Sequence, residues 1–103
     1  MDKYKIVITQ RAFSDLLECV LFVNTVSKEA AKKLHLEIME SIRSLETFPE
    51  AHPFIEGLTI ANVKVRRMLV HNGRYFILYK IEKDIVTIYD IVDSRKDNSI
   101  LKL

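Results

Sequence analysis

The fold is decided by the stretch Val63–Asp93, which reads VKVRRMLVHNGRYFILYKIEKDIVTIYDIVD. It contains three runs that are rich in β-branched and aromatic residues, and each run is short enough to be one strand. The first two runs meet at His71-Asn72-Gly73, and Asn-Gly is the strongest short signal for a β-hairpin. Glu82-Lys83-Asp84 supplies a second tight turn. The C-terminal half is therefore predicted to be a three-stranded antiparallel meander over residues 63–70, 73–81 and 85–93.

The sequence before this meander predicts one further strand and two helices. Tyr4–Thr9 has strand composition, and a first amphipathic helix follows from Ala12 to about Val26, with Thr9 or Ser14 available to cap it. A second helix runs from Glu29 and ends near Phe48-Pro49. The short link between the helices predicts an antiparallel hairpin. The apolar stripes are Phe13, Leu16, Leu17, Val20 and Val23 in the first helix, and Leu34, Ile38, Ile42 and Leu45 in the second.

Between the helices and the meander, residues 49–62 carry both prolines and Gly57 without clear periodicity. We interpret them as a connecting loop that has room for a short turn of helix. The element order is then βααβββ, and residues 94–103 form a short tail. We predict an α+β fold in which the helical hairpin packs on one face of a small, largely antiparallel sheet, with residues 1–103 forming a single domain.

Composition excludes several classes of protein. Hydrophobic residues make up 49% of the 103 residues, with only two Gly and two Pro, which is typical of a packed globule and not of a disordered chain. The single Cys19 cannot form an internal disulfide, so a reducing cytoplasm is the expected setting. No signal segment and no apolar run of membrane-spanning length are present, and we expect no membrane partner.

The positive charge is concentrated in the C-terminal half. The net charge is only +2, but eight of the sixteen Lys and Arg residues lie between Lys64 and Lys96. A weak net charge does not by itself indicate nucleic-acid binding. The position of the basic residues on the predicted sheet therefore matters more than their number.

Alternation along the strands sorts these residues by face. In the second strand of the meander Tyr75, Ile77, Tyr79 and Ile81 share one face, which we predict to be core, and Arg74, Phe76, Leu78 and Lys80 share the other. In the first strand Lys64, Arg66, Met68 and Val70 share a face, opposite Val63, Val65, Arg67 and Leu69. A mixed basic and apolar face suits phosphate contacts or burial under a partner, although a solvated face is the simpler interpretation. The predicted partner-binding residues are Lys64, Arg66, Met68, Arg74, Phe76 and Leu78.

No cofactor or metal site is predicted. His35, His52 and His71 are scattered over helix, loop and turn without the spacing of metal ligands. The sequence has no glycine-rich phosphate loop and no nucleophile elbow. Any chemistry would therefore depend on the basic side chains themselves.

The order of four segments along the whole chain resembles a known family. These segments are Ser44-Leu45-Glu46-Thr47-Phe48-Pro49, Arg66-Arg67-Met68-Leu69-Val70, Tyr75-Phe76-Ile77-Leu78-Tyr79-Lys80-Ile81 and Asp93-Ser94-Arg95-Lys96-Asp97. In this order and spacing the chain is similar to the RelE/ParE superfamily, the toxins of type II toxin–antitoxin systems, and to its plasmid-stabilisation group. The resemblance implies a growth-arresting toxin that a cognate antitoxin neutralises.

The resemblance leaves two mechanisms open. RelE-like toxins are metal-independent endoribonucleases that cleave messenger RNA in the ribosome, whereas ParE-like toxins block DNA gyrase without being nucleases. By resemblance the candidate catalytic residues are Arg66, Arg67, Arg74 and Arg95. However, Phe76 stands where RelE-like nucleases carry an arginine, and the tail after Arg95 has neither the Tyr nor the His of such enzymes. We therefore favour ParE-like gyrase inhibition, with a RelE-like nuclease as the alternative and a non-toxic protein-binding relative as a further one.

Overall fold

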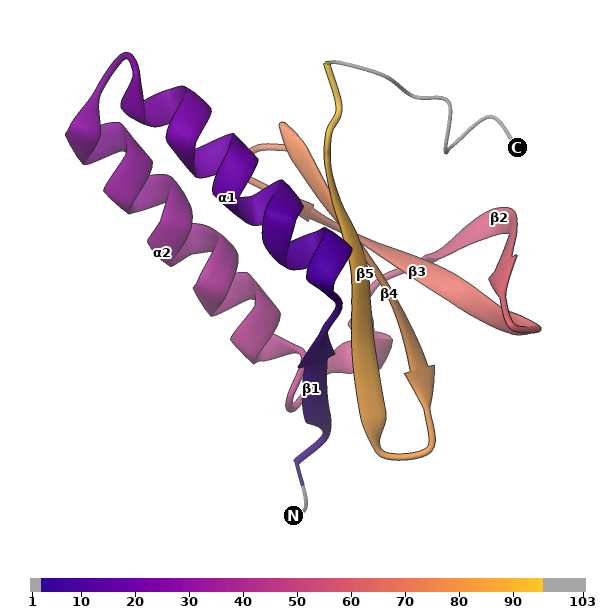
Figure 1. The fold of residues 1–103 in the computed structure, drawn as a ribbon. Helices are drawn as coiled ribbons and strands as arrows, with labels where there is room; N and C mark the ends of the chain where they lie inside the picture. Colours follow the sequence, from indigo (N-terminus) through magenta and orange to yellow (C-terminus); the bar gives the residue numbers. More distant parts are fainter. Residues whose placement is uncertain (1–2, 96–103) are drawn as a thin grey trace.

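The computed structural model describes residues 3–95, in which a helical hairpin covers one face of a five-stranded sheet (Figure 1). The sheet order is β1-β5-β4-β3-β2; β1 is parallel to β5 and all other neighbouring strands are antiparallel. The predicted α+β fold is confirmed. The elements are β1 (Lys5–Ile8), α1 (Gln10–Asn24), α2 (Lys28–Ser44), the 3-10 helix η1 (Pro49–Ala51), β2 (Phe54–Ile60), β3 (Val63–Val70), β4 (Tyr75–Glu82) and β5 (Ile85–Asp93).

Local signals place the helix starts and the turns close to their predicted positions. The Thr9 hydroxyl accepts a hydrogen bond from the Ala12 amide at 3.1 Å, so Thr9 and not Ser14 caps α1. Ser27 caps α2 in the same way through the Ala30 amide. These caps satisfy amide groups that have no partner within the helix.

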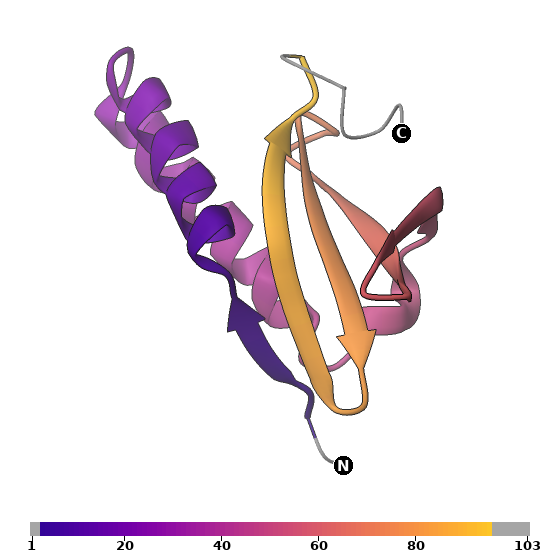
Figure 2. The ribbon, with the colours of Figure 1, turned by 45° about the vertical axis from the view of Figure 1, so that its right-hand side comes forward.

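The segment predicted as a connecting loop is more regular than expected. Residues 49–62 hold the helical turn η1 and also a complete strand, β2. This strand pairs with β3 at Phe54 and again at Thr59 and Ile60, and the register is irregular between them, where Gly57 has a φ of +80°. A strand that is interrupted in this way has no alternating pattern, which explains why the sequence did not reveal it. Figure 2 shows the β2 segment and the helices on opposite sides of β4 and β5.

The core lies between the helices and the sheet and centres on β4. Tyr79 is fully buried, and its hydroxyl donates a hydrogen bond to the Pro49 carbonyl at 2.6 Å. Burial raises the pKa of this phenol to about 12, so it remains a donor at neutral pH. The bond ties η1 to the middle of the sheet. The sheet residues of the core are Met68, Val70, Tyr75, Ile77, Tyr79, Val86, Ile88 and Ile91.

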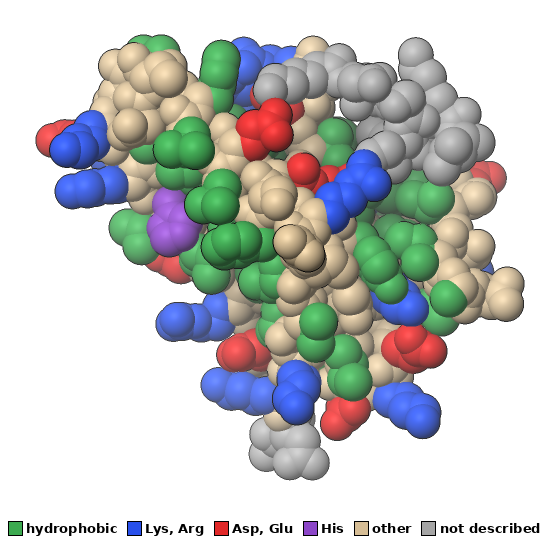
Figure 3. Space-filling model, viewed as in Figure 1, with side chains coloured by type: hydrophobic (Ala, Val, Ile, Leu, Met, Phe, Trp, Pro, Cys, Tyr) green, Lys and Arg blue, Asp and Glu red, His purple; other side chains and the backbone are tan. Residues whose placement is uncertain are grey.

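Only part of the apolar stripe of α1 is buried against the sheet. Ala12 and Leu16 are buried, as the helical spacing requires, but Phe13 and Leu17 are 52% and 47% exposed. The prediction that these two residues face the core was wrong, because they lie one position round the helix from the buried row. Figure 3 shows such exposed hydrophobic side chains over the helical hairpin.

β5 contains a bulge, and the residues at the bulge contact the first half of α1. Leu78 pairs with Asp90 but Tyr79 pairs with Ile88, so Tyr89 is the extra residue on β5. The Ile91 amide contacts the carboxylates of Asp90 at 3.0 Å and of Asp15 at 3.4 Å. Burial, followed by the hydrogen bond to Asp90 and the charge of Asp90, raises the pKa of Asp15 from 3.8 to about 6.

Replacement of a core residue should destabilise the fold far more than replacement of an exposed one. Ile77→Ala should lower the free energy of unfolding by about 2–5 kcal/mol, because it loses buried apolar surface and leaves a cavity. Leu36→Ala, at an exposed position of α2, should change it by no more than about 0.5 kcal/mol. Urea denaturation followed by circular dichroism measures both, and equal effects would contradict this assignment of the core.

Asp15 should make stability fall as the pH rises. Its pKa is raised on folding, so its stabilising contribution is complete below about pH 4 and is lost as the pH rises through about 6. Asp15→Asn mimics the protonated carboxyl. The variant should match the wild type near pH 4 and be the more stable of the two at pH 7. Chemical denaturation at both pH values tests this, and parallel stability curves from pH 4 to pH 7 would refute it.

Candidate functional site

The face of the sheet opposite the helices carries basic side chains that lie over aromatic rings. Arg67 pairs with Leu78 and therefore shares this face with it. The Arg67 guanidinium lies 5.0 Å from the centroid of the Phe76 ring. Lys80 lies 5.6 Å from the ring centroid of Tyr89 and 3.0 Å from the Glu82 carboxylate. Charge and apolar surface are therefore combined on one face.

A groove of about 260 Å³ lies on this face, between β2 and the strands β4 and β5. Its floor includes Val65 and Leu78, which are buried although no helix covers them. At its other end Arg11 forms an ion pair with Asp90 at 3.1 Å. This open-face groove is lined by Arg11, Leu58, Ile60, Val65, Leu78, Tyr89 and Asp90.

The predicted face of β3 was wrong. Arg66 pairs with Tyr79 and Met68 with Ile77, so the row that contains Lys64, Arg66 and Met68 belongs to the helix side and not with Phe76 and Leu78. Met68 is only 3% exposed and is part of the core. The relative faces of two strands depend on the length of the turn between them, which here spans residues 71–74, and a shift of one residue exchanges the faces.

Arg66 and Lys64 surround one aromatic ring at the η1–β2 segment. Arg66 donates hydrogen bonds to the carbonyls of His52 at 2.6 Å and Glu50 at 3.4 Å, and its guanidinium lies 4.0 Å from the Phe54 ring centroid. Lys64 lies 5.2 Å from the same centroid. Burial, together with the charge of Arg66, lowers the pKa of His52. Arg66 thus anchors the segment that leads into β2, and Leu58 and Ile60 of β2 line the groove.

Arg74 and Arg95 lie together at another end of the sheet. Arg74, in the β3–β4 turn, lines a pocket on the helix side with Leu34 and Tyr75, so its predicted place beside Phe76 was wrong. Arg95 is exposed, with its Nε 3.7 Å from the Asp93 carboxylate. The Ser94 amide donates to the Arg74 carbonyl, which connects the two sites. The predictions for the tail after Arg95 fall outside the described residues.

Several residues of the open face and its groove were not predicted as site residues. Lys80 shares the face of Phe76 by alternation, so its position could have been used. Arg11, Leu58 and Ile60 carry no sequence signal, because the packing of α1 against β5 and the irregular path of β2 bring them to the groove.

Among residues 3–95, no group of His, Cys, Asp and Glu is arranged to hold a metal ion. No helix in this part of the chain is long and apolar enough to cross a membrane. The open face combines an apolar surface with basic side chains at its border. This combination is typical of a surface that binds another macromolecule.

Comparison with known proteins identifies the family. Residues 6–98 match the family model described as the ParE toxin of the type II toxin–antitoxin system parDE. A search of curated proteins gave no match.

Two solved structures have a similar fold. The chromosomal ParDE toxin–antitoxin system from P. aeruginosa aligns with a TM-score of 0.69 at 16% identity, over 87% of this chain and 95% of that one. The archaeal RelE–RelB complex from Pyrococcus horikoshii OT3 aligns with a TM-score of 0.58 at 15% identity, over 91% and 98%. At these identities the similarity concerns the fold. The match to the family model extends over nearly all of the sequence, and the chain belongs to the ParE toxin family of type II toxin–antitoxin systems.

Proposed function

We propose that this toxin arrests growth by inhibiting DNA gyrase without catalysing a reaction, and that a cognate antitoxin neutralises it. The observation that carries the proposal is the dispersal of the candidate catalytic arginines. Arg67 lies on the open face, Arg66 lies against η1, and Arg74 and Arg95 lie at another end of the sheet. Metal-free cleavage of RNA requires charged and proton-transferring groups that converge on one phosphate.

The other groups of the described chain agree with this proposal. Arg66 is bonded to backbone carbonyls, which reduces its availability to a phosphate. None of the three histidines lines the open-face groove. His71 contacts the Glu37 carboxylate at 2.9 Å, and the His52 ring packs edge-on against Tyr79. A general base for the 2′-hydroxyl is therefore not supplied by histidine on this face.

The open-face groove supports the proposal of an antitoxin partner. Its apolar floor suits the buried side of an amphipathic segment, and Arg67 suits an acidic residue beside it. Lys80 is buried against Glu82, and Arg11 is already paired with Asp90. Phe76 and Leu78 remain in the proposed partner-binding set, and Arg67 replaces Arg66 and Met68 there. A partner that binds only the folded toxin stabilises it by mass action.

Expression of the toxin alone should arrest bacterial growth, and coexpression of the antitoxin encoded beside it should restore growth.

Purified antitoxin at about one hundred times its Kd should stabilise the folded toxin by roughly 2.7 kcal/mol, seen as a higher melting temperature in calorimetry. Arg67→Glu should weaken binding, because it places a negative charge beside an acidic segment, whereas Arg43→Glu on the exposed surface of α2 should not. Normal growth despite abundant folded toxin would favour the non-toxic binding relative.

The target can be tested with the same arginines. Wild-type toxin should inhibit supercoiling by purified gyrase and should leave ribosome-bound message intact. Arg67→Ala and Arg95→Ala should reduce this inhibition. Exposed Arg95→Ala should change stability by about 0.5 kcal/mol or less. Half-buried Arg67→Ala should cost no more than about 1 kcal/mol, from its contact with the Phe76 ring. Arg66→Ala should instead lower the melting temperature, since it frees the η1–β2 segment. Cleavage of ribosome-bound message by the wild type, lost in the arginine variants, would establish the RelE-like alternative.

A further inference from the structure

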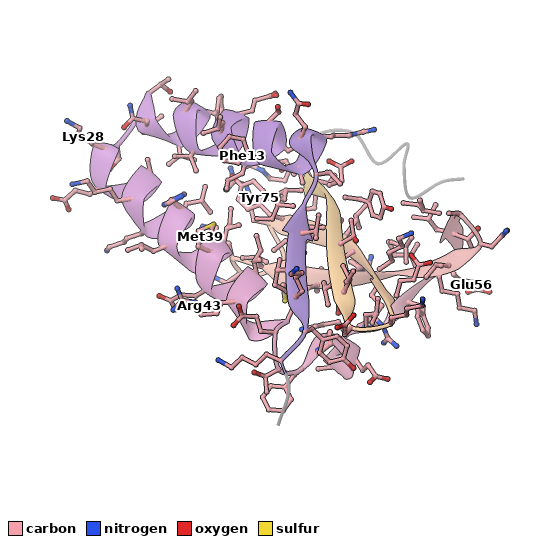
Figure 4. The ribbon with its side chains drawn as sticks, turned by 60° about the horizontal axis from the view of Figure 1, so that its bottom comes forward. Phe13, Lys28, Met39, Arg43, Glu56 and Tyr75 are labelled. Carbon is pink, nitrogen blue, oxygen red and sulfur yellow. The ribbon has the colours of Figure 1, made fainter. Side chains whose placement is uncertain are left out.

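A second pocket lies on the helix side of the sheet, at the tip of the helical hairpin. It has a volume of about 320 Å³ and is bounded by the ends of α1 and α2 and by the β3–β4 turn. Its apolar wall comes from Phe22, Val26, Leu34 and Tyr75. Figure 4 shows Tyr75 in the space between the helices and the strands. This volume is at the low end for ligand pockets, which suits one large side chain better than a drug-sized molecule.

Cationic groups surround the apolar wall. Lys33, His71 and Arg74 line the pocket, and none of its nine lining residues is acidic. Glu37, which is not among the lining residues, lies 2.9 Å from the His71 ring, so His71 already has an acidic partner. Lys33 and Arg74 therefore give the pocket a positive potential, and neither has an ion-pair partner within residues 3–95.

Arg74 also has a donor that the described chain does not use. Its Nε is buried and has no hydrogen-bond partner among residues 3–95. A buried donor without an acceptor destabilises a protein, and an acceptor that reaches it gains a charge-assisted hydrogen bond. A carboxylate beside the apolar wall would provide this acceptor after a rotation of the Arg74 guanidinium, because Nε itself is not exposed to solvent.

We propose that this pocket binds a large apolar side chain together with a neighbouring carboxylate, both presented by an acidic segment of a protein partner. The proposal rests on the antitoxin pairing proposed above and adds a contact on the opposite side of the sheet from the open-face groove. The apolar wall selects the side chain, and Lys33 and Arg74 select the acid. Exposed Phe22 and Val26, the latter 85% accessible, would be covered by the partner.

The chemistry of the pocket can be tested without the partner. Titration of the ¹⁵N-labelled toxin with 3-phenylpropionate should shift the amide signals of residues 22–34 and 71–75, with a Kd on the order of 1 mM. The uncharged 3-phenylpropanamide should bind roughly tenfold more weakly, because it cannot form charge-assisted bonds. Equal binding of acid and amide, or equal displacement by inorganic phosphate, would overturn the proposal, as would shifts outside these two segments.

Two neighbouring lysines of α2 provide a matched control. Lys33 lines the pocket and Lys32 does not, although both are exposed. Lys33→Glu should abolish detectable binding of 3-phenylpropionate, and Lys32→Glu should leave the Kd within about twofold. Ala30→Leu fills the pocket from an exposed helical position that tolerates leucine, and it should also block the probe. Unchanged binding by Lys33→Glu and Ala30→Leu would refute the site.

The same variants separate this proposal from the proposed function. Where the wild type binds the antitoxin, Lys33→Glu and Ala30→Leu should raise the Kd at least tenfold relative to Lys32→Glu, as measured by calorimetry. An antitoxin complex that all three variants form equally well would overturn the pocket as a partner contact while leaving the toxin–antitoxin pairing intact. Absence of any complex with the wild type would overturn the pairing, and with it the partner named here, even if the small acid binds.

Discussion

The bulge at Tyr89 is the constraint on which both surfaces of the sheet depend. Because β5 contains one extra residue opposite Leu78 and Tyr79, Ile88 and Ile91 both point into the core although they are three positions apart. A strand without the bulge would expose one of them. The same extra residue leaves Asp90 beside Arg11, at the end of the open-face groove. It also leaves Asp90 beside Asp15, whose pKa is raised first by burial and then by Asp90. One local irregularity thus connects core packing with the charge of the groove.

A second set of contacts holds the wall of that groove in place. The buried hydroxyl of Tyr79 binds the Pro49 carbonyl, and Arg66 binds the carbonyls of Glu50 and His52. Tyr79 comes from β4 and Arg66 from β3, and both hold the segment that leads into β2 by hydrogen bonds. These bonds act together with the buried ring of Pro49, and they satisfy carbonyls that would be costly to leave unpaired near the core. The shape of the groove therefore depends on residues that do not line it.

Most of the elements could be predicted from the sequence, because their signals are local. The turn at Asn72-Gly73, the cap at Thr9 and the apolar stripe of α2 each act over a few residues. The faces of the strands could not be predicted as reliably, because they depend on how long the turn is and on whether a bulge intervenes. This is why Met68 was placed on the wrong face. For the same reason alternation identified Phe76 and Leu78 as open-face residues but could not bring Arg11 or Ile60 beside them.

The fold alone leaves the target of this toxin undetermined, since its backbone is similar both to a ParDE system and to a RelE–RelB complex. One fold can host different functions, so the side chains must select the target. In this chain Arg66 anchors the segment that leads into β2, and Arg74 lines the helix-side pocket. Both are therefore withdrawn from the open face on which Arg67 lies. The basic residues that remain there lie against aromatic rings and beside an apolar groove, an arrangement better suited to binding a protein than to cleaving RNA.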